Sequence, residues 1–168
     1  MKSKCNSRWQ FASAGLVGAL TIASASIAQT IPKEGRYDYT ACYSGVRNTL
    51  EFSKTHSASS SEYTGTIRTN PPGGLFDRSS FRCVGMNASL DGKISSHSVC
   101  ESVDPEGDKR LASFSQQGDK VTRENVVGTG KYDGMVASGT VEPMPPFPTI
   151  KPGTFQACNH QMGTYKLK

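Results

Sequence analysis

The chain has 168 residues, of which 35% are hydrophobic and 20% charged, and its formal net charge is +5. This length fits one domain of ordinary size, and the composition is too polar for a protein that crosses a membrane many times. The sequence contains no block of like charges, which argues against a nucleic-acid-binding arm. Composition therefore favours a single small domain and indicates no activity.

Residues 1–28 have the organisation of a secretory signal peptide. Three basic residues and no acid precede or flank an apolar run over residues 11–22, and the small residues Ser26 and Ala28 mark a cleavage point after Ala28. The run is shorter than the roughly 20 residues that a bilayer-spanning helix needs, so an uncleaved anchor is the less favoured alternative. We expect a periplasmic or secreted protein without stable membrane insertion.

Removal of residues 1–28 changes the charge and the cysteine count. Three basic residues leave with this segment, so 16 basic and 14 acidic residues remain, a net charge of +2. Such a small charge does not indicate a nucleic-acid partner. Trp9 and Cys5 leave too, so the expected mature domain, residues 29–168, has four cysteines and no tryptophan.

Residues 29–168 show almost no helical periodicity, and strand patterns recur throughout. Alternation of apolar and polar residues predicts strands over residues 36–44, 48–54, 63–67, 81–88, 93–103, 109–116, 120–127, 135–141, 154–159 and 164–168. Turn residues such as Asp91-Gly92 and Asp133-Gly134 separate many of these segments. Short strands at this spacing predict an all-β fold, either an antiparallel sandwich or a barrel.

Two segments are expected to lie outside the sheet. Ser57–Ser61 has the composition of a flexible loop. Residues 143–152 hold five of the nine prolines, and proline has no backbone N–H to donate to a ladder. We expect an extended, stiff connection that spans one end of a barrel. A Pro-rich ligand for a partner protein is the alternative.

The four remaining cysteines can pair in three ways. Asp91-Gly92 predicts a two-residue hairpin turn, which places residues whose numbers sum to 183 opposite each other. Cys83 and Cys100 meet this condition at a non-hydrogen-bonded position, where Cα atoms approach to about 4.5 Å. A disulfide is expected there, which leaves Cys42 and Cys158 to pair between the first strand and one near the end. A metal-binding or catalytic role is less favoured, because the chain has no C-x-x-C motif.

Two further motifs suggest ligand binding but fail in detail. Gly128–Lys131 is similar to part of a phosphate-binding loop, yet Asn125 stands where that loop needs Gly and Tyr132 where it needs Ser or Thr. The three acids within residues 104–108 could face a hard cation, but two basic residues follow, so an acidic turn is favoured. The three histidines are scattered. We expect no cofactor and no metal site.

Two motifs lie between Cys100 and Thr140, namely C-E-S-V-D-P-E-G-D-K and the glycine-rich V-V-G-T-G-K-Y-D-G-M-V-A-S-G-T. They resemble motifs of exported bacterial proteins of the allene oxide cyclase/dirigent barrel type, over about a quarter of the chain. The resemblance implies a closed, calycin-like, eight-stranded antiparallel barrel with a hydrophobic lumen. No catalytic residue of the plant cyclases can be matched to a position here, so the resemblance implies the fold and not the reaction.

Three functions remain as hypotheses. The first and favoured one is binding of an apolar or aromatic small molecule without catalysis, with Tyr37, Tyr39 and Tyr43 as ligand-facing residues. Packing in the core explains the same tyrosine stripe equally well. The second is an isomerase or cyclase that works by confinement and needs a buried acid, for which Asp38 and Glu101 are candidates. The third is a non-catalytic envelope protein whose Pro-rich loop docks a partner. The sequence does not indicate an oligomeric state.

Overall fold

The structure is a computed structural model that describes residues 31–168, so the predicted signal peptide lies outside the described residues. Eight strands and one short 3-10 helix follow each other along the described chain. They are β1 (Glu34–Ser53), β2 (His56–Thr69), β3 (Ser80–Leu90), β4 (Lys93–Val103), β5 (Lys109–Gln117), β6 (Lys120–Gly128), η1 (Gly130–Tyr132), β7 (Val136–Pro143) and β8 (Thr154–Lys166).

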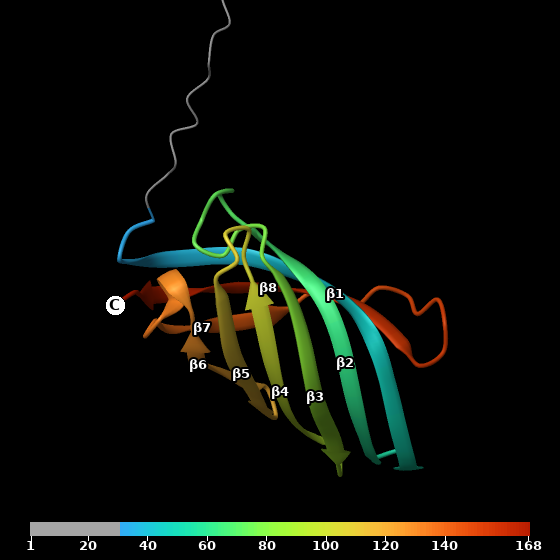
Figure 1. Ribbon diagram of the computed structural model, residues 1–168. Coiled ribbons are helices and arrows are strands. Elements are labelled where there is room, and N and C mark those ends of the chain that lie inside the picture. Colours follow the sequence, from blue (N-terminus) through green and yellow to red (C-terminus); the bar gives the residue numbers. More distant parts are fainter. Residues whose placement is uncertain (1–30) are drawn as a thin grey trace, which may run out of the picture.

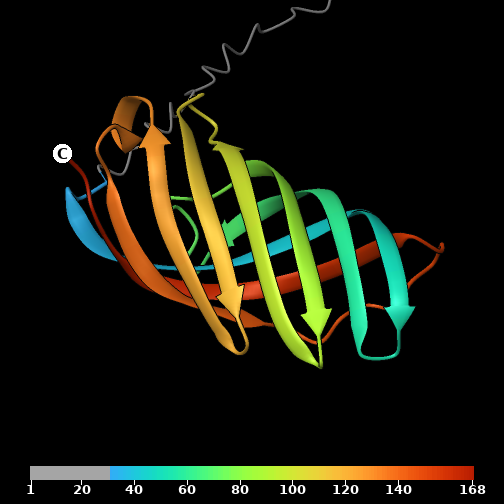
Figure 2. The ribbon, with the colours of Figure 1, turned by 90° about the horizontal axis from the view of Figure 1, so that it is seen from below.

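The strands form one antiparallel sheet in the order β6-β5-β4-β3-β2-β1-β8-β7 (Figure 1). Consecutive strands pair along the chain except for β6 and β7, and β8 lies between β1 and β7. Figure 2 shows the sheet curling into a barrel, and β6 and β7 come into contact without sharing a hydrogen-bonded ladder. The predicted all-β fold is confirmed as an eight-stranded, nearly closed antiparallel barrel.

Two pairs of predicted strands prove to be single strands. Segments 36–44 and 48–54 fall in β1, which ends at Ser53, and segments 154–159 and 164–168 fall in β8, which ends at Lys166. A glycine lies where each break was expected, and it serves close packing instead. An added Cβ at Gly45 would overlap the carbonyl oxygen of Glu62, and one at Gly163 would overlap that of Ser138. These glycines therefore let the strands coil tightly without interrupting them.

The prediction of a flexible loop at Ser57–Ser61 is wrong. This stretch belongs to β2 and pairs with β1 on one side and with β3 on the other. Ser59 is buried and donates a hydrogen bond to the side-chain oxygen of Asn87. Small polar residues indicate flexibility when they are solvated, but here neighbouring strands bind the backbone on both sides.

The Pro-rich segment continues the line of β7 beside β8. The N–H of Met144 donates to the carbonyl of Cys158 at 3.0 Å, and the N–H of Phe147 donates to that of Gln156 at 3.4 Å. Met144 and Phe147 are the two residues of 143–148 that are not proline, so the segment uses every N–H it has. It is extended, as expected, but it runs along a strand.

The predicted cysteine pairing is confirmed. β3 and β4 have the expected register, in which Cys83 faces Cys100 with the Cα atoms 4.1 Å apart. Both residues of the connecting turn have positive φ, 51° and 75°, as the predicted hairpin requires. Cys42 and Cys158 are bonded across β1 and β8. The first disulfide lines the lumen, and strand alternation places the second on the outer face.

The core fills one end of the barrel, which we call the closed end. The loop between β2 and β3, residues 70–79, folds into the lumen and buries Phe76 completely. Asp77 fastens this loop, because its carboxylate accepts hydrogen bonds from two backbone N–H groups at 3.0 and 3.1 Å. The rings that surround Phe76, with centroids 5.3 to 6.0 Å away, are Tyr37, Tyr39 and Tyr132.

Candidate ligand-binding site in the barrel lumen

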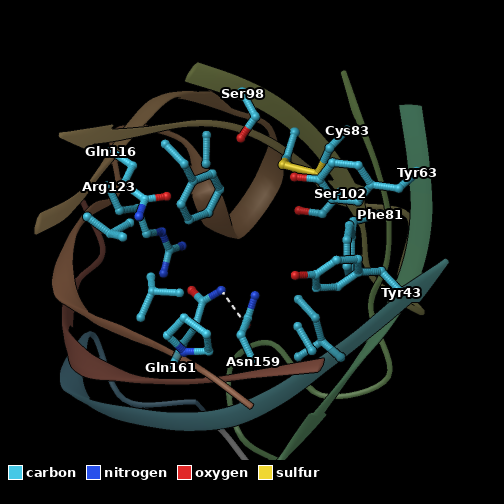
Figure 3. Close-up of a pocket in the computed structure, with 18 of the residues that line it drawn as sticks. Tyr43, Tyr63, Phe81, Cys83, Ser98, Ser102, Gln116, Arg123, Asn159 and Gln161 are labelled. Atoms are coloured by element: carbon cyan, nitrogen blue, oxygen red, sulfur yellow. Dashed lines mark hydrogen bonds between the residues drawn. A yellow bond between two sulfur atoms is a disulfide. The ribbon is translucent and has the colours of Figure 1, made fainter. Parts of the chain in front are cut away.

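A cavity of about 210 Å³ lies in the lumen beside the closed end and is partly open to solvent (Figure 3). Inward-facing residues from all eight strands line it, because strand alternation turns every second side chain into the barrel. The aromatic members of its wall are Tyr39, Tyr43, Tyr63, Phe81 and Phe114. The polar members labelled in Figure 3 are Ser98, Ser102, Gln116, Arg123, Asn159 and Gln161.

The predicted tyrosine stripe is divided between the core and the cavity. Tyr39 and Tyr43 line the cavity. Tyr37 lies in the core cluster against Phe76, where its hydroxyl donates to the carbonyl of Ser138 at 3.3 Å. Tyr39 also belongs to the core cluster, so the stripe contributes to packing at Tyr37 and Tyr39 and to the cavity wall at Tyr39 and Tyr43.

Hydrogen bonds fix the polar groups along β8. The hydroxyl of Tyr39 donates to Oε1 of Gln161 at 2.5 Å, and Nε2 of Gln161 donates to Oδ1 of Asn159 at 3.0 Å. Figure 3 shows this amide pair at the edge of the cavity. Because each group is already bonded to its neighbour, the pair presents an oriented polar edge to the lumen.

Two arginines project into the lumen, Arg110 from β5 and Arg123 from β6. They are 6% and 8% exposed, respectively. Their Cζ atoms lie 3.8 and 5.5 Å from the centroid of the Phe76 ring, so both guanidinium groups adjoin the plug of the closed end. Sequence analysis singled out neither residue. The sequence does contain a signal: Arg110 is two residues before Ala112 and four before Phe114, so all three share one face of the strand, and that face is the apolar, inward one.

The hydrogen bonds of the two guanidinium groups are incomplete. Nε of Arg110 donates to Oγ of Ser102 at 2.7 Å. Nη1 of Arg123 donates to the hydroxyl of Tyr37 at 3.1 Å, and its Nη2 lies 3.4 Å from Oδ1 of Asn125. Nη1 of Arg110 and Nε of Arg123 have no partner among the described residues.

Burial determines how these groups ionise. It lowers the pKa of Arg110, yet a guanidinium starts so high that it stays protonated at neutral pH. Burial also raises the pKa of Tyr43 and Tyr63. It raises that of Tyr37 as well, although the charge of Arg123 opposes the shift. These hydroxyls therefore remain neutral, and the lumen carries positive charge.

The two acids proposed for a cyclase lie outside the cavity. Asp38 lies on the face of β1 that points away from Tyr37 and Tyr39, with its Oδ1 2.8 Å from Nε2 of His160. Glu101 is exposed and pairs with Lys109 at 3.0 Å. Among residues 31–168, no Asp or Glu lines the cavity.

The acidic turn and the glycine-rich segment meet each other instead of forming ligand sites. Nζ of Lys131 lies 2.6 Å from a carboxylate oxygen of Asp104 and 2.6 Å from one of Glu106. The N–H of Lys131 donates to Asp108 at 3.0 Å. Within the described residues, no cluster of three or more His, Cys, Asp or Glu side chains is arranged to hold a metal ion.

No helix in residues 31–168 combines the length and the apolar character needed to cross a bilayer. Comparison of the chain with family models, with curated proteins and with solved structures finds no match.

Proposed function

We propose that the protein binds a small molecule with an apolar or aromatic part inside the lumen of its barrel. The cavity supports this most directly, since five aromatic rings form its wall and polar groups occupy fixed positions among them. Ligand sites commonly combine an apolar wall with a few placed polar groups. The cavity is smaller than the roughly 300–1,000 Å³ typical for drug-sized ligands, so the ligand is small or projects from the open side.

Binding without catalysis is favoured over the isomerase or cyclase alternative. Confinement chemistry of that kind needs an acid with a raised pKa in the lumen. Asp38 and Glu101 are engaged with His160 and Lys109 outside it. The resemblance of residues 100–140 to proteins of the allene oxide cyclase/dirigent type supports a common barrel with a lumen, and membership of that family is part of this proposal.

The proposal places the protein outside the cytoplasm, in the periplasm or secreted. The predicted signal peptide and the two disulfides support this location. Intact-mass measurement of the exported protein should show a chain that lacks residues 1–28. A mass that retains them would contradict export with cleavage.

Ligand-observed ¹⁹F NMR with the uncharged probe 4-fluorobenzyl alcohol tests the binding function. We expect saturable binding to the wild-type protein. Ser98→Trp, which places a large side chain in the cavity, should abolish it. Val99→Trp is the matched control, because Val99 is the next residue of β4 and faces the outer surface. Thermal melting confirms that both variants fold. Absence of saturable binding to the wild type, or binding by the folded Ser98→Trp variant, would refute the proposal.

A further inference from the structure

The lumen holds two positive charges that the described part of the chain does not neutralise. Arg110 and Arg123 are both more than nine-tenths buried. None of the salt bridges formed within residues 31–168 includes either of them. The groups that contact them are hydroxyls, an amide and aromatic rings, all of them uncharged.

Burying two unpaired guanidinium charges costs free energy unless an anion binds beside them. Removing a charged group from water costs several kcal/mol, and proteins normally offset this with an opposite charge and full hydrogen bonding. Here each guanidinium keeps a buried nitrogen without a partner. Both side chains line the cavity, and Figure 3 shows Arg123 extending into it. The unbalanced charge therefore lies at the wall of the cavity, and the unpartnered nitrogens belong to the same two guanidinium groups.

The shape of the site selects the kind of anion. A guanidinium is a planar fork of N–H donors, which matches the two oxygens of a carboxylate. Away from the arginines, the cavity wall contains Tyr43, Tyr63 and Phe81, which suit an apolar or aromatic body. The ligand that satisfies both parts carries its charge at one end and its apolar group at the other.

We propose that the cavity binds a small organic acid, with its carboxylate held by Arg110 and Arg123 and its apolar or aromatic part among the rings farther along the lumen. This inference rests on the proposed function and specifies the class of ligand. The two arginines are the binding residues for the head group, and the Phe76 plug that both adjoin sets the depth of the site.

The test compares 4-fluorobenzoate with 4-fluorobenzyl alcohol by ¹⁹F NMR titration, because the two probes differ mainly in the charged group. We expect the wild-type protein to bind the acid at least tenfold more tightly, as hydrogen bonds to a charged partner imply. Arg123→Met should weaken binding of the acid much more than binding of the alcohol, because only the acid places a negative charge beside the guanidinium groups. Arg82→Met is the matched control, since Arg82 lies on the outer face and pairs with Glu62.

Thermal melting shows whether the Arg123→Met variant folds. Because replacing an unpaired buried charge by an apolar side chain of similar length removes a desolvation cost, Arg123→Met should melt no lower than the wild type. The wild-type comparison of acid and alcohol needs no variant, so it tests the inference even if Arg123→Met does not fold.

Equal affinity of the wild type for the two probes overturns the organic-acid inference and leaves the proposed function intact. Binding of neither probe overturns both. Inorganic sulfate that competes as well as 4-fluorobenzoate would show a plain anion site and also overturn the inference.

Discussion

The two halves of the lumen share the same alternation of inward and outward residues, but they differ in what fills them. At the closed end, Phe76 packs between tyrosine rings. In the hollow half, the inward residues of β4 include Ser96 and Ser98, which are too small to reach across. An eight-stranded barrel is just wide enough for side chains to fill, so their size decides whether a region is packed or empty.

This difference separates stability from binding. The closed end buries aromatic area from distant parts of the chain, whereas the hollow half keeps polar groups and space available. Substitutions at the closed end should therefore change the free energy of unfolding most. Substitutions in the hollow half should change ligand affinity more than stability.

The largest effect is expected from Phe76→Ala. Its ring is completely buried, so the substitution should lower the free energy of unfolding by about 3–5 kcal/mol, measured by urea denaturation. Phe52→Ala is the control at the opposite end of the barrel, where the ring is 86% exposed, and it should change stability by no more than about 0.5 kcal/mol. Similar losses in the two variants would remove the distinction between the ends.

A smaller effect is expected from removing the disulfide that lines the cavity. Cys83 and Cys100 enclose a loop with a sequence separation of 17, so the double substitution to Ala should cost about 3 kcal/mol in the chain-entropy model. The barrel should still fold, because the ladder between β3 and β4 remains. Urea denaturation measures the loss, and full reduction of the wild type should destabilise it further because the second disulfide is then lost too. An unchanged stability would contradict the expected role of this bridge.

The smallest effect concerns Asp104, at the turn that precedes β5. Burial opposes ionisation of this carboxyl, but hydrogen bonds and the charge of Lys131 outweigh it and hold its pKa below the ordinary value. Its contribution to stability is therefore present above the ordinary pKa, near 4, and is lost as the pH falls through the lower, folded value.

Asp104→Asn should cost about 2 kcal/mol at pH 7, as loss of hydrogen bonds to a charged group implies, and should flatten the decline of the melting temperature below pH 4. Melting curves from pH 7 to pH 2 provide the measurement. Glu106→Gln is the control, since Glu106 contacts the same Lys131 but its side chain is 64% exposed. If Asp104→Asn follows the acid curve of the wild type, Asp104 does not supply this stability.

Turn geometry and the alternation of strand residues were sufficient to predict the parts of the fold that depend on residues close together in the sequence. The two-residue turn at 91–92 sets the register of β3 and β4, and that register alone brings Cys83 opposite Cys100. Once those two are paired, elimination assigns Cys42 to Cys158. Alternation likewise located β4, β5 and β6 to within a residue at each end.

The same rules failed where distant segments decide the outcome. A glycine at position 45 is equally compatible with a break and with close packing, and only the approach of β2 shows that β1 continues through it. The serines of β2 are indistinguishable in composition from a loop until strands lie on both sides.

The sequence by itself determined the all-β class, the hairpin register and the disulfide pairing, because each follows from a period of two residues and from turn geometry. Only the tertiary structure decided which inward side chains meet. It brought Phe76 from a loop into the barrel and placed Arg110 and Arg123 beside it, in a cavity that no acid of residues 31–168 lines. The physical reason is that the curvature of the whole sheet, which closes the barrel, sets the distances across the lumen.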